Sequence, residues 1–157
     1  MSLFKTKLSL PMVAVCVIAG AAGATPSLGV TSQIFSRVAL APSHATGEDG
    51  KGWEVELKTK GLSDVVTQKI VIQPGGHAGW HGHPGAHFGS VQTGTLTLYD
   101  ADHCEPHVYP TGTGFIDSAG GHHIARNEGT TPVELWVTYV LPHGSTLRTD
   151  MPAACGF

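Results

Sequence analysis

The sequence predicts an all-β protein, built as a small barrel or as two packed sheets. Its 21 glycines and 10 prolines are spread along the chain, which favours short strands joined by tight turns over long helices. Several segments alternate apolar and polar residues, the period of a half-buried strand, and they recur roughly every eight to twelve residues. With 157 residues, of which 41% are hydrophobic, one domain with one core is expected.

The strands expected before the middle of the chain follow a polar N-terminal arm over residues 25–50. Within this arm, residues 34–40 are apolar enough to dock as an edge strand. Residues 53–58 alternate strictly, which predicts a half-buried strand, and residues 65–73 predict the next one. The side chains expected to face inward from the first of these strands are Trp53, Val55 and Leu57. The main domain is expected over residues 51–157.

The second half of the chain predicts a further series of short strands, for a total of seven to nine. Gly94 separates the first two of them and predicts a hairpin. The last strand is a seven-residue segment that is apolar except for Thr138, and it is expected to be buried on both faces. These strands are expected at residues 88–93, 95–100, 107–110, 115–117, 124–128 and 135–141.

The first 24 residues have the three parts of a cleaved secretion signal. Lys5 and Lys7 form a positive start, residues 8–20 are mostly apolar, and residues 22–24 offer a small-x-small cleavage site. A retained membrane anchor is the alternative, but the apolar stretch is shorter than the roughly 20 residues needed to span a bilayer. We therefore expect a secreted or periplasmic protein without a stable membrane anchor.

Removal of this leader would leave Cys104 and Cys155 as the two remaining cysteines. In an oxidising compartment such a pair is expected to form a disulfide, and two unrelated free thiols are the alternative. The bond would tie the C-terminal tail to the middle of the domain. Neither cysteine lies at metal-ligand spacing from the histidines, so neither is expected to bind a metal.

Charged residues are too few and too scattered for a nucleic-acid interface. They make up 13% of the chain, the formal net charge is −3, and Lys and Arg form no cluster. Nucleic acid is therefore not an expected partner.

Four of the ten histidines fall between residues 77 and 87. Among them, His81, His83 and His87 are separated by two and four residues, so on an extended strand all three leave the same face. Imidazole nitrogen is the commonest protein donor to Zn, Cu, Fe and Ni. The spacing therefore predicts a site for one divalent transition-metal ion.

This stretch resembles the first motif of the cupins, G-x5-HxH-x3or4-E-x6-G, with His87 in the place of the glutamate. The matching residues are Gly75, His81, His83 and Gly94. The second cupin motif, G-x5-PxG-x2-H-x3-N, follows at a short separation, with Ser118 in the place of the proline. Its matching residues are Gly112, Gly120, His123 and Asn127. Two motifs in order are more specific than either alone.

The resemblance implies a small jelly-roll β-barrel that holds a metal ion inside. The implied ligands are His81, His83, His87 and His123. His122 is the alternative to His123, but a shift by one residue would turn every side chain of the strand to the other face, and only His123 fits the motif register. Tyr99 and Asn127 are the candidates for orienting a substrate.

Replacement of the glutamate by histidine affects the expected metal. Four neutral imidazoles do not neutralise any of the charge of a divalent ion, whereas a glutamate would neutralise one unit of it. A ligand shell made only of nitrogen atoms favours Fe, Cu, Ni or Zn over Mn. Among the cupins, all-histidine sites include dioxygenases, so the resemblance implies a dioxygenase-like oxidoreductase acting on a small molecule. The alternatives are a non-enzymatic metal- or small-molecule-binding cupin and a Zn or Ni isomerase or lyase. Homodimerisation, common among the proteins this one resembles, is an expected assembly.

Overall fold

The computed structural model describes residues 23–157, so nearly all of the expected leader lies outside the described residues. The described part consists of strands and their connections. The strands are β1 (Leu28–Leu40), β2 (Ser43–Glu48), β3 (Glu54–Thr59), β4 (Ser63–His77), β5 (His81–Gly82), β6 (Ala86–Thr93), β7 (Thr95–Asp100), β8 (Pro106–Pro110), β9 (Gly114–Asp117), β10 (His123–Arg126), β11 (Val133–Pro142) and β12 (Thr149–Asp150). Their number exceeds the seven to nine expected, partly because β5 and β12 are two-residue strands too short to predict.

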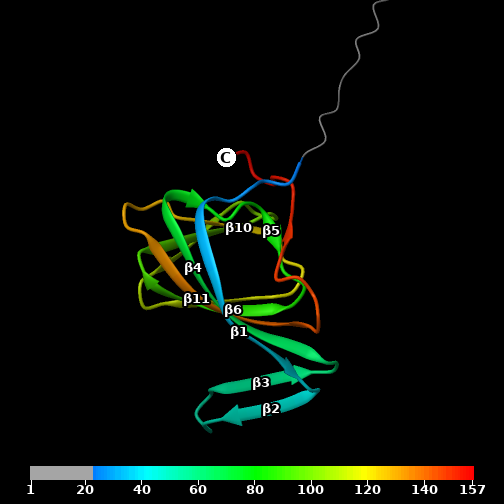
Figure 1. Ribbon diagram of the computed structural model, residues 1–157. Coiled ribbons are helices and arrows are strands. Elements are labelled where there is room, and N and C mark those ends of the chain that lie inside the picture. The colour runs from blue at the N-terminus through cyan, green and yellow to red at the C-terminus, as the bar shows by residue number, and fades with distance from the viewer. Residues whose placement is uncertain (1–22) are drawn as a thin grey trace, which may run out of the picture.

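Ten of the strands form one antiparallel sheet that curls into a barrel (Figure 1). The main path runs β12-β5-β10-β4-β11-β6-β9, while β1 pairs with β4, and β7 joins β10 to β8. This all-β jelly-roll confirms the expected fold class. No helix among residues 23–157 has the length and apolar character needed to cross a membrane.

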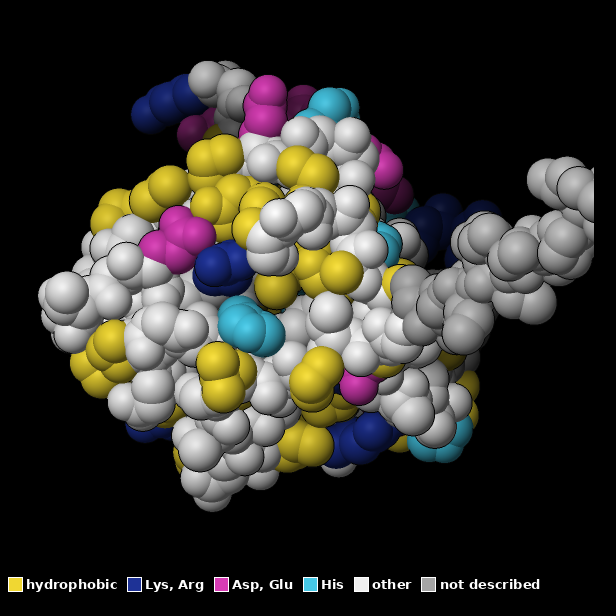
Figure 2. Space-filling model, turned by 90° about the horizontal axis from the view of Figure 1, so that it is seen from above, with side chains coloured by type: hydrophobic (Ala, Val, Ile, Leu, Met, Phe, Trp, Pro, Cys, Tyr) yellow, Lys and Arg dark blue, Asp and Glu magenta, His cyan; other side chains and the backbone are white. Residues whose placement is uncertain are grey.

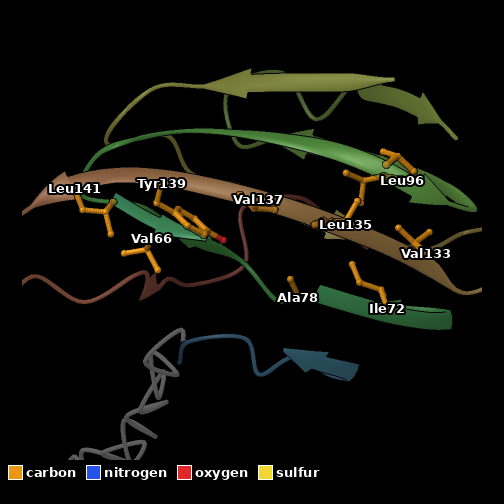
Figure 3. Packing of buried hydrophobic residues seen from close by; sticks show 11 residues of the cluster. Val66, Ile72, Ala78, Leu96, Val133, Leu135, Val137, Tyr139 and Leu141 are labelled. Carbon is orange, nitrogen blue, oxygen red and sulfur yellow. The ribbon is translucent and has the colours of Figure 1, made fainter. Parts of the chain in front are cut away.

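The core lies between the walls of the barrel, and β11 contributes the largest share of it (Figure 3). Its odd-numbered residues, from Val133 to Leu141, are all buried, whereas the side chains between them are half-buried or exposed. Trp136, for example, is 37% exposed. The expectation that this strand is buried on both faces is therefore wrong. The barrel covers only its inner face, and a predominantly apolar run of residues does not reveal this.

The strand expected at residues 53–58 exists as β3, but its predicted orientation is wrong. β3 pairs with β2 in a separate two-stranded sheet that stands below the barrel in Figure 1. Trp53 is 58% exposed and Leu57 61% exposed. Alternation indicates that a strand has two different faces, but it cannot indicate whether a second layer covers either of them.

The segment at residues 34–40 docks on the barrel, as expected, within the longer strand β1, which pairs with β4 along its length. The barrel sheet thus includes residues ahead of the boundary expected at residue 51. One anchor of β1 is the buried carboxylate of Asp64, which accepts a hydrogen bond from Arg37 Nε at 2.8 Å. Asp64 also contacts His143 Nδ1 at 2.7 Å, which ties the end of β11 to the same carboxylate.

The C-terminal tail crosses back over the barrel after β11. Cys104 and Cys155 form a disulfide with their Cα atoms 5.9 Å apart, as predicted from the cysteine count. In addition, β12 pairs with β5, so that Asp150 lies opposite His81. Both contacts hold the tail beside the histidine-rich stretch.

Candidate metal centre

The four predicted histidines lie inside the barrel and come from three parts of the sheet. His81 belongs to β5 and lies directly opposite His123 of β10 across the sheet. His83 follows in the loop after β5, and His87 belongs to β6. All four side chains are buried, each with at most 7% of its surface exposed. His81, His83 and His87 thus share the barrel interior, but they do not lie on one extended strand as the spacing predicted, because β5 ends at Gly82 and β6 begins at Ala86.

The neighbouring residue His122 points to the other side of its strand. Its ring packs edge-on against Trp80, and its Nε2 lies 3.1 Å from the carbonyl oxygen of Pro152. The predicted choice of His123 over His122 for the barrel interior is thus correct.

Backbone carbonyls fix the rings of His81 and His83. His81 Nδ1 lies 2.8 Å from the carbonyl oxygen of Gly79, and His83 Nδ1 lies 2.6 Å from that of Leu147. A carbonyl can only accept, so in each neutral ring Nδ1 carries the proton and Nε2 keeps its lone pair. This arrangement is typical of histidines that bind a metal through Nε2.

Asp117 of β9 approaches His123 in a similar way. Its Oδ2 atom lies 2.9 Å from His123 Nδ1, at hydrogen-bonding distance although off the line of an ideal hydrogen bond. Asp117 also lies opposite His87 across the β6–β9 pair. Sequence reasoning missed this residue. A carboxylate six positions before His123, in a site whose usual glutamate is absent, was the available signal.

Burial keeps these imidazoles neutral. Desolvation lowers the pKa of His81 to about 2, that of His83 to about 4 and that of His87 to about 3. The close contact with His123 lowers the pKa of Asp117 to about 2, so this carboxylate is charged at neutral pH. Neutral imidazoles beside one carboxylate are the protonation states that a divalent metal requires.

The potential ligand atoms form two overlapping groups. One atom from each of His81, His83 and His123 lies within 4.8 Å of the others, and the same holds for His87, Asp117 and His123. His87 Nδ1 is buried without a hydrogen-bond partner among the described protein atoms. The cluster can therefore hold a metal ion, whereas ligation by all four histidines at once stays a prediction.

Tyr99 does not face the cavity, contrary to expectation. Leu96 and Leu98 of β7 line the cavity instead, because the leucines rather than the alternating threonines fill the apolar interior. The hydroxyl of Tyr99 donates to Glu128 at 3.0 Å, and its ring packs against Phe157 with centroids 4.6 Å apart.

Asn127 is buried, but its side chain forms hydrogen bonds with backbone groups and does not line the cavity. Its side-chain nitrogen donates to the carbonyl oxygens of Ile72 and Thr131, and its oxygen accepts from Gly129 N. Every hydrogen-bonding group of this side chain is thus occupied in fixing the turn after β10. The expected role in orienting a substrate is not supported.

A cavity of about 280 Å³ opens beside the histidines. Its walls are mainly apolar, and its polar side chains include Gln68, Tyr139 and Arg148. Tyr139 lies across the β6–β11 pair from His87, stacks on its ring, and donates its hydroxyl to Gln68 at 3.0 Å. Burial raises the pKa of Tyr139, so its hydroxyl keeps its proton. Tyr139 was expected in the core or at a pocket wall, whereas Gln68 and Arg148 were not predicted from the sequence.

Comparison with known families confirms the resemblance seen in the two motifs. The model of the cupin domain family matches residues 68–139, which include all four histidines. These residues form a cupin domain. No curated protein matches the chain.

Solved structures similar to this cupin chain include a regulatory domain and two oxalate enzymes. The cupin domain of a transcriptional regulator from Enterobacter cloacae is 13% identical, with 74% of this chain and 100% of that chain covered and a TM-score of 0.48. An oxalate oxidase in complex with glycolate is 24% identical, with 48% and 41% covered and a TM-score of 0.45. The oxalate decarboxylase of Bacillus subtilis is 15% identical, with 55% and 24% covered and a TM-score of 0.48. This cupin therefore spans less than half of either oxalate enzyme.

Proposed function

We propose that this cupin is an exported, metal-dependent oxidoreductase of the dioxygenase type that acts on a small molecule. One divalent transition-metal ion would be held by His81, His83, His87 and His123. The observation that carries the proposal is the cluster of four buried imidazoles at the wall of a largely apolar cavity. A metal at this place would supply a Lewis-acidic and redox-active centre in contact with a bound substrate.

The residues around the cluster prepare it for such an ion. The carbonyl oxygens of Gly79 and Leu147 hold two of the rings with Nε2 unprotonated. The carboxylate of Asp117 holds the ring of His123 and offsets one positive charge, which in most cupins is the task of the glutamate that His87 replaces. Because nitrogen donors predominate, Fe, Cu, Ni and Zn fit this site better than Mn.

The cavity provides the other requirement of the proposed reaction. Its apolar wall would exclude water from the metal-facing side of a substrate, and the Tyr139 hydroxyl with the Gln68 amide offers a fixed polar contact. Both groups stay uncharged at neutral pH, so they can orient a substrate by hydrogen bonds without adding a charge.

Metal content and oxygen consumption test this proposal together. Protein purified without an affinity tag should contain about one equivalent of a redox-active metal, and the loaded protein should consume oxygen with some member of a panel of diketones, thiols and catechols. The variant His87→Ala should lose metal, whereas His122→Ala, which changes the neighbour that faces away from the cavity, should retain it. If His87→Ala keeps full metal affinity, His87 is not a ligand and the site has three histidine ligands instead of four.

Zinc as the sole native metal, without oxygen consumption under any metal loading, would contradict the oxidoreductase. A Zn enzyme of the isomerase or lyase type, or a non-enzymatic binding protein, would then take its place.

Export is supported by the signal-like composition of the first 24 residues and by the Cys104–Cys155 disulfide. Expression of the full chain in a bacterial host should yield a periplasmic protein whose measured mass corresponds to an N-terminus at Thr25. A mass that still includes the leader would contradict cleavage.

A further inference from the structure

We propose that the cavity binds an organic carboxylate with a small apolar body, and that Arg148 holds its carboxylate group. The inference deepens the proposed function, since it takes the same cavity as the substrate site and names the substrate class. It rests on the position of Arg148 at the cavity wall and on the state of its hydrogen-bond donors.

Arg148 is the single Lys or Arg side chain that lines the cavity in the described part of the chain. It sits on the C-terminal tail, directly after Leu147, whose carbonyl oxygen holds His83. The positive charge is therefore at the same cavity as the histidines. Figure 2 shows the Lys and Arg side chains scattered over the outer surface, one of them beside an acidic side chain.

Hydrogen bonds hold the guanidinium of Arg148 in place, but they do not use all of its N–H donors. Its Nε donates to Asp150 Oδ1 at 2.8 Å, its Nη2 donates to the same oxygen, and its Nη1 donates to the carbonyl oxygen of Ala78 at 2.9 Å. A guanidinium has five N–H donors, so these contacts leave one N–H on each of the two terminal nitrogens. N–H groups on the two terminal nitrogens of a guanidinium can together bind a carboxylate through both of its oxygens.

The rest of the cavity selects the body of the ligand. The wall includes Ile70, Leu96, Leu98 and Val137, which offer contacts to an aliphatic or aromatic group and no hydrogen bonds. The volume of about 280 Å³ lies at the small end of the range for ligand pockets. An acid with a short branched chain or one ring suits this space, whereas a highly hydroxylated ligand would leave its polar groups unpaired.

Binding of matched acids and amides to zinc-loaded protein tests the inference without turnover. The probes are phenylacetate and 3-methylbutanoate, each compared with its neutral amide by isothermal titration calorimetry. We expect each acid to bind at least about tenfold more tightly than its amide, as charge-assisted hydrogen bonds predict. Arg148→Met should abolish this preference by weakening the acid while leaving the amide unchanged.

Two further variants separate recognition from structure. Asp150→Asn removes the charge that neutralises Arg148 but retains an acceptor, so the preference for acids should persist or increase. Arg148→Lys keeps the positive charge but loses the planar set of N–H donors of the guanidinium, so it should weaken acid binding several-fold. This variant keeps the inference testable if Arg148→Met does not fold.

Three results would overturn the inference. They are equal affinity for acid and amide in the wild type, an acid preference that is undiminished in both Arg148→Met and Arg148→Lys, and no binding of either acid at millimolar concentration. An undiminished acid preference in these variants would indicate that the carboxylate binds to the metal and not to Arg148. Absence of oxygen consumption would remove the proposed oxidoreductase but leave these binding results unaffected, so the two failures are distinguishable.

Discussion

Asp117 Oδ2 lies 2.9 Å from Nδ1 of His123, and this contact joins the last residue of β9 to the first residue of β10. It puts one negative charge beside imidazoles that burial keeps neutral. Asp117→Asn should therefore lower metal affinity about 10- to 100-fold, the usual effect of removing a carboxylate that orients a metal-binding histidine. Competition with a fluorescent zinc chelator measures the effect.

The exposed carboxylate of Asp102 provides the matched control for this variant. Asp102→Asn removes the same charge from the surface, so metal affinity should not change. Equal metal affinity of the wild type and of Asp117→Asn would show that Asp117 neither orients His123 nor binds the metal.

The stability of the metal-free protein should depend on pH through the buried histidines. In the fold, the pKa values of His81, His83 and His87 lie at about 2, 4 and 3, whereas each unfolded histidine takes up a proton near 6.5. The unfolded chain thus binds more protons below pH 6.5. The free energy of unfolding should then fall as the pH drops from 6.5 toward 4, by up to about 1.4 kcal/mol per pH unit for each histidine.

Urea unfolding at several pH values between 7.5 and 4.5 measures this dependence. Below pH 4, Asp117 should act in the same direction, because its lowered pKa stabilises the fold only while the carboxylate is charged. A flat profile between pH 7 and 5 would contradict the burial of neutral imidazoles.

The disulfide should contribute strongly to the stability of this cupin. It joins residues 51 positions apart, and the double variant Cys104→Ser, Cys155→Ser should lose roughly 2–4 kcal/mol of unfolding free energy. Urea unfolding of the variant and of wild type, each with and without reductant, measures this loss. Reductant should lower the unfolding free energy of the wild type but not that of the double variant. If reductant leaves the wild-type value unchanged, the disulfide does not stabilise the fold.

The inner face of β11 should dominate the response of this strand to mutation. Leu141 is 1% exposed, and Leu141→Ala should cost about 2–5 kcal/mol through lost burial and a residual cavity. Thr138→Ala, on the opposite face of the same strand, should cost less than about 1 kcal/mol. Thermal unfolding of the two variants checks the difference, and similar losses would contradict the alternation of the two faces.

Features with a local cause could be predicted from the sequence. The two-residue period of a strand distinguishes His123 from His122. It also led to the correct side for His81, His83 and His87, although a loop after β5 separates them. The two cupin motifs meet through a hydrogen bond from Gly120 N to the His83 carbonyl oxygen at 2.9 Å, which no local rule predicts.

Features that depend on long-range pairing could not be predicted. Asp117 joins the site because β9 pairs with β6, thirty residues earlier in the chain. Tyr99 was assigned to the wrong face because alternation does not state which set of side chains the barrel covers. Trp53 was expected inside for the same reason, since nothing in its own strand reveals that the β2–β3 hairpin stands apart from the barrel.

The family match ends at residue 139, but the cavity is completed by residues after that point. Leu147 supplies its contact to His83 through a backbone carbonyl, which any amino acid at that position would provide. Arg148, next to it, acts through its side chain. Evolution could therefore exchange the ligand preference of such a protein by substitutions in the tail, while the histidines and their supporting carbonyl stay in place.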